Sequence, residues 1–223
     1  MIDQIIKIWI KSEFVQGEIP TPILGDWFRL HFIENPGMAF GTTFGAKMWH
    51  KLALSLFRII AISGIAYYIW KELNRGVKTE YLIAIGLIFT GAMGNLIDSM
   101  LYDYIFTFDP CNFYNQLNGS ENFIQCEHHS PHGGSYTITH EVRHHGFLLG
   151  NVVDMFQFNV SWPKWVPWLG GGQIFPAIWN VADACITCGV GMILIRNKTY
   201  FPKEEELESE EELESEEESE KKD

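Results

Sequence analysis

The sequence predicts an α-helical membrane protein in which four spanning helices form a bundle with a small β-sheet on its outer face. Long apolar segments at 52–70, 81–101 and 175–195 are the main observation. Because a bilayer core requires about 20 apolar residues per spanning helix, each segment is long enough to cross it. The alternative is a set of buried helices in a soluble protein, but segments of this length within 223 residues favour the membrane.

The fourth helix is the first in the chain, and the sequence predicts that it is truncated. Residues 1–14 are mostly apolar but contain charges at Asp3, Lys7 and Lys11. This segment is too short to span a bilayer from its first residue and too charged for the apolar region of a signal peptide. We therefore expect residues 1–12, approximately, to form the second half of a spanning helix whose first half is missing.

The distribution of basic residues predicts which helix ends face the cytoplasm. Loop 71–80 contains three basic residues, and Arg196, Lys198 and Lys203 closely follow the last apolar segment, whereas 102–174 contains only Arg143 and Lys164. Positive charge accumulates on the cytoplasmic side of a membrane. We expect both termini in the cytoplasm and the segments 11–51 and 102–174 outside.

Two outer segments have the composition of β-strands. Residues 26–34 begin with alternating bulky side chains and lead into a Gly/Pro turn, and 146–160 is rich in β-branched and aromatic residues. They predict a small sheet on the outer membrane surface. Residues 41–51, which contain Gly41 and Gly45, are a candidate for a mobile lid.

The acidic character of the protein comes from its C-terminal tail. The net charge is −12, and residues 203–223 contribute −10 of it through thirteen acidic and three basic side chains. This density of like charge predicts disorder. We expect a single membrane domain over 1–202 and a disordered tail over 203–223, with an interaction segment as the alternative to a solvated tail.

Polar side chains gather near the outer ends of the last two apolar segments. Asn95 and Asp98 are three residues apart, as are Asn180 and Asp183, so each pair shares one helix face. Asp154 lies in the outer segment that precedes the last span. We expect these side chains to meet at one depth, at the outer edge of the membrane.

Asp183 is the strongest functional candidate among them. An ionisable group inside a span costs about 2.5–3.5 kcal/mol on insertion scales, so a carboxylate is an expensive choice for a structural role. Asp98 lies nearer the interface, where a structural role fits it as well as a functional one. Two carboxylates at low dielectric share a proton, as in an aspartic protease. The spacing permits Asp154 and Asp183 to form such a dyad but does not establish it.

Five motifs, in order, resemble those of the bacterial lipoprotein signal peptidase family, also called signal peptidase II. Each motif alone is weak, but their combination is specific, and together they extend over residues 3–195 apart from one insertion. The matching segments are DQIIK (3–7), ENPGMAFG (34–41), GAMGNLIDS (91–99), GNVVDMFQF (150–158) and FPAIWNVADACI (175–186).

The resemblance implies a four-helix aspartic peptidase of the bacterial inner membrane, with its active site at the outer, periplasmic face. Such an enzyme removes the signal peptide from diacylglyceryl-modified prolipoproteins by cleaving before the lipidated cysteine. The resemblance gives the catalytic roles to Asp154 and Asp183. It gives supporting or substrate-binding roles to the residues that match the family's other polar positions, namely Asn35, Asn95, Asp98, Asn180, Asp3 and Lys7.

The resemblance also implies the partners of the protein. We expect it to contact prolipoprotein and membrane lipid, to bind globomycin-type cyclic peptide inhibitors, and to act as a monomer. We expect no nucleic acid partner, no metal and no organic cofactor.

The chain departs from the family pattern in three respects. Ser99 replaces the arginine that usually follows Asp98 and that would place a charged anchor near the site; Arg143 is our candidate for its replacement. The stretch between the two Gly-Asn-x-x-Asp motifs is expanded by an insertion over about 102–148, and the first helix is shortened.

The insertion contains cysteines and histidines that the family resemblance does not explain. Cys111 and Cys126 would face an oxidising compartment, and either a disulfide or two free thiols fits the sequence. The histidines are numerous enough for a metal site, but there is no Cys-x-x-Cys motif beside them and solvated side chains are the simpler interpretation. They are His128, His129, His132, His140, His144 and His145.

Two other classes of protein remain open. A small transporter or metal-handling membrane protein would relay protons through its intramembrane acids and capture metal with its outer histidines. Such a relay needs ionisable groups along the depth of a span, whereas here they gather at one edge. A non-catalytic assembly factor would use the polar residues as a helix interface, and it would tolerate asparagine at Asp154 and Asp183.

Overall fold

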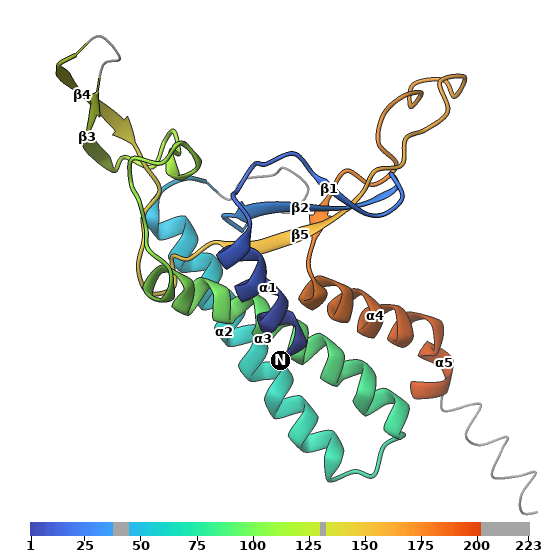
Figure 1. Ribbon diagram of the computed structural model, residues 1–223. Helices are drawn as coiled ribbons and strands as arrows, with labels where there is room; N and C mark the ends of the chain where they lie inside the picture. Colours follow the sequence, from blue (N-terminus) through green and yellow to red (C-terminus); the bar gives the residue numbers. More distant parts are fainter. Residues whose placement is uncertain (38–44, 130–132, 202–223) are drawn as a thin grey trace, which may run out of the picture.

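The computed structural model describes residues 1–37, 45–129 and 133–201. Its longer helices run side by side below a sheet that lies across one end of them, whereas the α2–α3 turn and the short helix α5 lie at the opposite end (Figure 1). The helices are α1 (Ile2–Glu13), α2 (Met48–Leu73), α3 (Thr79–Ile105), α4 (Val181–Ile195) and α5 (Asn197–Tyr200).

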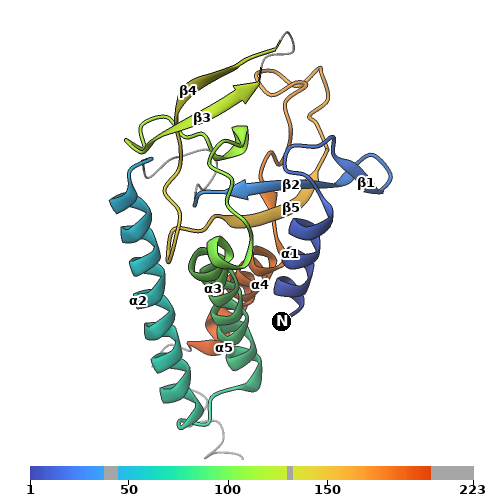
Figure 2. The same ribbon diagram turned by 60° about the vertical axis from the view of Figure 1, so that its left-hand side comes forward.

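Helix α3 is the centre of the helical part, since it packs against both α2 and α4 (Figure 2). Small residues let α3 and α4 approach closely. A Cβ atom added at Gly189 would lie 2.5 Å from the carbonyl oxygen of Ala84, and one at Gly91 would collide with the carbonyl oxygen of Ala182. Small residues at a helix interface are typical of helices that associate in a bilayer, where burial of apolar surface provides no driving force.

Helices α2 and α3 are long and apolar enough to cross a membrane. Many of the apolar side chains of α2 are exposed, including Phe57, Ile60 and Trp70, each more than half accessible. An apolar helix that exposes this surface requires an apolar solvent, and a lipid bilayer supplies one. Helix α4 is equally apolar but has only 15 residues.

The main sheet is antiparallel, with strand order β1-β2-β5-β6. Strands β2 and β5 form most of it, and their register places Ile33 opposite Asp154 and Asn35 opposite Val152. The sheet therefore joins the segment before α2 to the segment before α4. Its strands are β1 (Thr21–Leu24), β2 (Phe28–Asn35), β5 (Val152–Phe158) and β6 (Ile178–Trp179).

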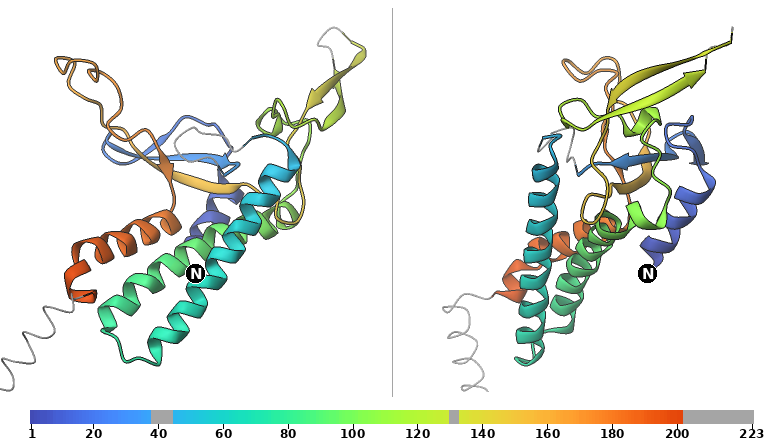
Figure 3. Two further views of the ribbon diagram at one scale, coloured as in Figure 1. Left: turned by 180° about the vertical axis from the view of Figure 1, so that it is seen from behind. Right: turned by 90° about the vertical axis from the view of Figure 1, so that its left-hand side faces the viewer.

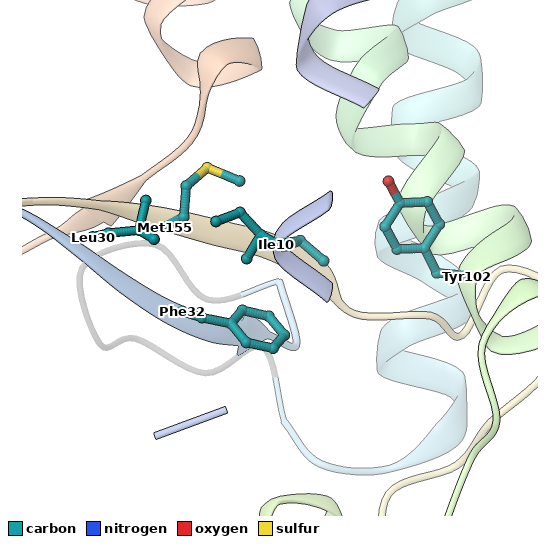
Figure 4. Packing of buried hydrophobic residues seen from close by; sticks show 6 residues of the cluster. Ile10, Leu30, Phe32, Tyr102 and Met155 are labelled. Carbon is teal, nitrogen blue, oxygen red and sulfur yellow. The ribbon is translucent and has the colours of Figure 1, made fainter. Parts of the chain in front are cut away.

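The buried core lies between this sheet and the two helices beneath it. Ile10 from α1 and Tyr102 from α3 pack against Phe32 of β2 and Met155 of β5, and all four are almost fully buried (Figure 4). Burial of a large apolar side chain contributes about 1.5–3 kcal/mol. This cluster fixes α1 and the sheet relative to α3, and thereby positions the polar residues that lie beside it.

The insertion forms a separate hairpin of strands β3 (Phe123–His129) and β4 (Ser135–Glu141). The hairpin, yellow-green in Figure 3, extends beyond the main sheet and away from the helices. A disulfide between Cys111 and Cys126 ties the middle of β3 to the loop after α3. The sequence left this pairing open, and the structure forms it.

Several boundaries differ from those expected. The predicted strand at 26–34 appears as β2, and β5 occupies the middle of 146–160. The apolar segment predicted as a span over 175–195 becomes helical only at Val181, because the residues before it pair with β5 as β6. The proposed lid at 41–51 lies partly outside the described residues, and the tail at 203–223 lies wholly outside them.

Candidate active site

Asp154 and Asp183 come from different elements and line the same cleft. Asp154 lies in the middle of β5, where its side chain is 2% exposed. Asp183 lies in the first turn of α4 and is partly exposed. The sheet and the helix therefore bring to one cleft two carboxylates that are 29 residues apart in the chain, a meeting that the sequence spacing permitted but did not establish.

Asn180 links the two carboxylates. It is the N-cap of α4 and forms a capping box with Asp183, in which the backbone N–H of Asp183 donates to Asn180 Oδ1 at 2.9 Å. In return, the backbone N–H of Asn180 donates to Asp183 Oδ2 at 3.2 Å. The Asn180 amide also donates to Asp154 Oδ1 at 2.6 Å. One fully buried asparagine thus holds both acids, Asp154 through its side-chain amide and the Asp183 carboxylate through its backbone N–H.

Two further amides bind the second oxygen of each carboxylate, the one that does not accept a hydrogen bond from Asn180. Asn35 Nδ2 donates to Asp154 Oδ2 at 3.0 Å, and Asn95 Nδ2 donates to Asp183 Oδ1 at 2.8 Å. Asn35 is placed by the end of β2 and Asn95 by α3. The amides therefore act as neutral donors that orient the acids without neutralising them.

Asp154 titrates at an unusual pH because of its surroundings. Its pKa rises from the usual 3.8 to about 7, chiefly because burial disfavours the charged form and also because the negative charge of Asp183 lies nearby. The hydrogen bonds from Asn35 and Asn180 act in the opposite direction. A carboxyl group with this pKa holds a proton near neutral pH, which suits a proton donor.

Asp98 belongs to a buried ion network beside the dyad. Lys7 Nζ lies 2.8 Å from Asp98 Oδ2, and neither side chain is exposed to solvent. The same ammonium donates to Asn95 Oδ1 at 2.8 Å. Asp98 Oδ2 also accepts a hydrogen bond from the backbone of Val153, the residue before Asp154. The structure therefore gives Asp98 a supporting position next to the dyad.

Asp3 connects α1 to the start of α4. Its Oδ1 accepts a hydrogen bond from the backbone N–H of Ala182 at 2.9 Å, and its Oδ2 lies 3.1 Å from Lys7 Nζ. A carboxylate at the N-terminus of a helix satisfies free N–H groups and interacts favourably with the helix dipole. The two charged residues predicted from the first motif therefore both lie within the polar cluster.

The dyad opens into a cleft of about 560 Å³. One part of its wall is polar and consists of the dyad with Asn35, Asn95 and Arg58. The rest is largely apolar and is formed by residues of β5, of the segment 175–179 that ends with β6, and of α4, which are Val152, Phe158, Phe175, Ala177, Ile178, Trp179, Ala184, Thr187 and Cys188, together with Gly37.

Sequence reasoning missed a polar stripe on α2. Lys51, Ser55 and Arg58 follow helical spacing on one face of α2. Lys51 and Ser55 donate to the backbone carbonyl groups of Leu149 and Leu148. Arg58 donates to Ser99 Oγ at 3.0 Å. The signal was present in the sequence, because Arg58 is the one charge within the apolar segment 52–70.

The proposal that Arg143 replaces the missing arginine at position 99 is wrong. Arg143 forms a bidentate ion pair with Asp103, with distances of 2.9 and 3.1 Å, and lies 3.9 Å from Glu34. It anchors the insertion to the end of α3. The cation that contacts Ser99 is Arg58, which reaches it from α2.

Within the described residues, no group of three or more His, Cys, Asp or Glu side chains is placed to hold a metal ion. His128 and His140 approach each other across the hairpin, with their Nε2 atoms 3.2 Å apart. His132 lies outside the described residues.

The sequence and the fold both match known proteins. The sequence profile of the family described as signal peptidase (SPase) II matches residues 1–198. The chain is 37% identical over 201 residues to the lipoprotein signal peptidase of Porphyromonas gingivalis, covering 87% of this chain and 77% of that protein. It is 32% identical over 203 residues to the lipoprotein signal peptidase of Amoebophilus asiaticus, covering 87% and 72%.

Two solved bacterial membrane enzymes have a similar fold. The first, at 2.3 Å resolution, aligns with a TM-score of 0.54 and 22% identity, covering 91% of this chain and 85% of that one. The second, at 1.9 Å resolution, aligns with a TM-score of 0.50 and 21% identity, covering 87% and 83%. At this identity the likeness concerns the fold of a membrane enzyme.

Proposed function

The chain belongs to the signal peptidase II family, an aspartic-type peptidase family that removes signal peptides from prolipoproteins, and we propose that Asp154 and Asp183 are its catalytic dyad. The observation that supports this most directly is the bridge formed by Asn180, which contacts both carboxylates at the wall of one largely apolar cleft. A purely structural capping box would explain Asp183 but not the buried Asp154 beside it. We further propose that the bond cleaved is the one before a diacylglyceryl-modified cysteine.

We propose that Asp154 holds the proton of the dyad and that Asp183 is the ionised partner. Asp154 is almost fully buried and has a pKa of about 7. Asp183 is partly exposed and lies in the first turn of α4, where the helix dipole favours a negative charge. The two environments therefore separate the roles of two chemically identical groups.

The mechanism follows from these protonation states. Asp183 takes a proton from a water molecule, which attacks the carbonyl carbon, while protonated Asp154 donates its proton to the carbonyl oxygen. The tetrahedral intermediate then collapses. Asp183 passes its proton to the leaving amine of the cysteine, and the proton on the former carbonyl oxygen returns to Asp154. The amides of Asn35, Asn95 and Asn180 keep the carboxylates in place throughout.

We propose that the protein lies in the bacterial inner membrane with four helices, α1 to α4, of which α1 covers only part of a span, and that the sheet lies on the outer, periplasmic face with the dyad. The α2–α3 turn and the end of α4 lie at the helix ends remote from the sheet (Figure 1). An ion pair between Arg196 and Glu80 joins these ends at 3.0 Å. Their basic residues favour the cytoplasm for this end, and so for the C-terminus, and we place the N-terminus there as well.

The proposed partners follow from this placement. The apolar part of the cleft suits the lipid or the signal helix of the substrate, and a cyclic peptide inhibitor of the globomycin type would occupy the same space. We propose a monomer that contacts membrane lipid, without nucleic acid and without a metal or organic cofactor in the reaction.

We expect cleavage to fall as the pH rises through about 7. Asp154 binds its proton more tightly in the folded protein than a free carboxyl group with its usual pKa of 3.8, so the proton is present below pH 7, approximately, and lost above it. A profile of kcat/KM against pH should show this alkaline limb. Asn35→Ala removes a hydrogen bond that lowers the pKa of Asp154 and should move the limb to higher pH.

The control for this experiment is Asn74→Ala, in the loop between α2 and α3, which should leave the limb in place. A limb that Asn35→Ala leaves unchanged would contradict the assignment of the proton to Asp154.

We expect prolonged treatment with a metal chelator to leave the cleavage rate unchanged, because both catalytic groups of the proposed mechanism are carboxyl groups of the protein. The rate is measured on a lipidated prolipoprotein peptide before and after dialysis against EDTA. A loss of activity that zinc restores would overturn the mechanism and favour a metal site in the histidine-rich insertion.

A further inference from the structure

The dyad requires a compensating charge that the sequence motifs do not assign. Once it shares a single proton, the dyad still has one negative charge within a largely apolar cleft. Lys7 already pairs with Asp98 and Asp3, and it donates a hydrogen bond to Asn95. Among the described residues that line the cleft, Arg58 is the one cation.

Arg58 lies where a charge is costly. It interrupts the apolar segment 52–70 of α2, and an ionisable side chain within a span is costly to insert. Lys51 and Ser55 lie on the face of α2 that contacts the segment before β5. Arg58 lies on the same face, about one helical turn further along α2. The charge is therefore directed into the protein rather than toward lipid.

A chain of hydrogen bonds joins Arg58 to Asp183. Arg58 Nη1 donates to Ser99 Oγ at 3.0 Å, and Ser99 Oγ donates to the carbonyl oxygen of Asn95 at 3.3 Å. The amide of Asn95 donates to Asp183 Oδ1 at 2.8 Å. The hydroxyl that holds the guanidinium is neutral, and the carboxylates of Asp183, Asp98 and Asp154 attract the charge of Arg58.

We infer that Arg58 is a positioning residue of the dyad. Ser99 holds its guanidinium at the wall of the cleft, where its charge balances the dyad and its contact with Ser99 fixes the turn of α3 from which Asn95 reaches Asp183. This inference rests on the proposed function and names the cation of the same site. The small side chain at position 99 leaves room for the long side chain from α2, so the two positions form a matched pair.

The matched pair allows a reciprocal exchange. Arg58→Ser should lower kcat on a lipidated prolipoprotein peptide by about 100-fold, because a catalytic group displaced by about 1 Å loses activity of this order. The double variant with Arg58→Ser and Ser99→Arg returns the cation to the contact from α3. It should recover kcat to within about tenfold of the native rate, because the charge and the contact are restored.

Arg58→Lys and Arg75→Ser complete the experiment. Lysine keeps the positive charge but lacks the planar guanidinium group, so Arg58→Lys should have a kcat between those of the native protein and Arg58→Ser. Arg75 pairs with Glu72 at the remote end of α2, and its replacement should leave kcat unchanged. Each variant is purified in detergent, and its melting temperature is compared with that of the native protein.

The outcomes separate this inference from the proposed function. Native cleavage that disappears in Asp154→Asn supports the dyad, whatever Arg58 does. Native kcat in Arg58→Ser, or a double variant that fails to recover activity, overturns the role of Arg58 and leaves the dyad intact. If Arg58→Ser does not fold, the double variant decides: a folded, active double variant supports the pairing, and an inactive or unfolded one overturns it. A native protein without cleavage overturns both.

Discussion

Asp154→Asn and Asp183→Asn are each expected to reduce cleavage of a lipidated prolipoprotein peptide by about 10²- to 10⁴-fold, the range that general acid–base groups contribute. Asparagine keeps the size of aspartate and one of its two acceptor oxygens, but it neither holds nor accepts the transferred proton. Because Asp154 has a pKa of about 7, it is about half protonated at neutral pH, and its replacement removes only part of a buried charge. The rate is measured by mass spectrometry of the released peptide, and the melting temperature is measured in parallel.

Asp26→Asn is the matched control for both variants. Asp26 lies in the turn between β1 and β2, and its side chain is 91% exposed. The Asp26→Asn variant should cleave the peptide at the native rate. Native turnover by either dyad variant would exclude that aspartate from the reaction, and native turnover by both would favour the non-catalytic alternative.

Lys7→Met is expected to produce the largest loss of stability. Methionine approximately fills the volume of the lysine stem but leaves Asp98, which is 0% exposed, without its ionic partner. Removal of one member of a buried ion pair costs about 3–5 kcal/mol, because the remaining charge is buried and uncompensated. For a protein of this size, that cost corresponds to a fall in melting temperature of about 10 °C.

A double variant tests the cause of this loss. Lys7→Met combined with Asp98→Asn removes both charges, so it should be less destabilised than the sum of the two single variants. Lys71→Met, at an exposed position in the last turn of α2, should leave the melting temperature unchanged. Equal melting temperatures for Lys7→Met and Lys71→Met would show that the buried pair contributes no stability.

The sequence was informative wherever chemistry and periodicity agreed. Apolar length identified α2 and α3, and alternation identified β2. The cost of a carboxylate in an apolar segment singled out Asp183, and the family motifs added Asp154, which the structure places in the same cleft. The supporting residues predicted from the motifs also lie in this polar cluster: helical spacing puts Asp3 with Lys7 and Asn95 with Asp98, whereas Asn35 ends β2 and Asn180 caps α4.

Other features depended on contacts between distant segments. Periodicity cannot show that 178–179 pairs with β5, so the start of α4 was placed too early. It also cannot show which arginine approaches Ser99, since Arg58 and Arg143 are both isolated cations in the sequence. The structure decides it, because Asp103 engages Arg143 at the end of α3 and the turn of α2 directs Arg58 to Ser99. Both corrections concern tertiary packing rather than local propensity.

The most direct test of the proposed function is to locate the bond that the protein cleaves. The native protein is incubated with one prolipoprotein peptide in two forms, with and without diacylglyceryl on the cysteine, and the products are identified by mass spectrometry. We expect cleavage of the lipidated form alone, at the bond before the cysteine, and none by Asp183→Asn. Cleavage elsewhere in the peptide, or the same products from Asp183→Asn, would contradict it.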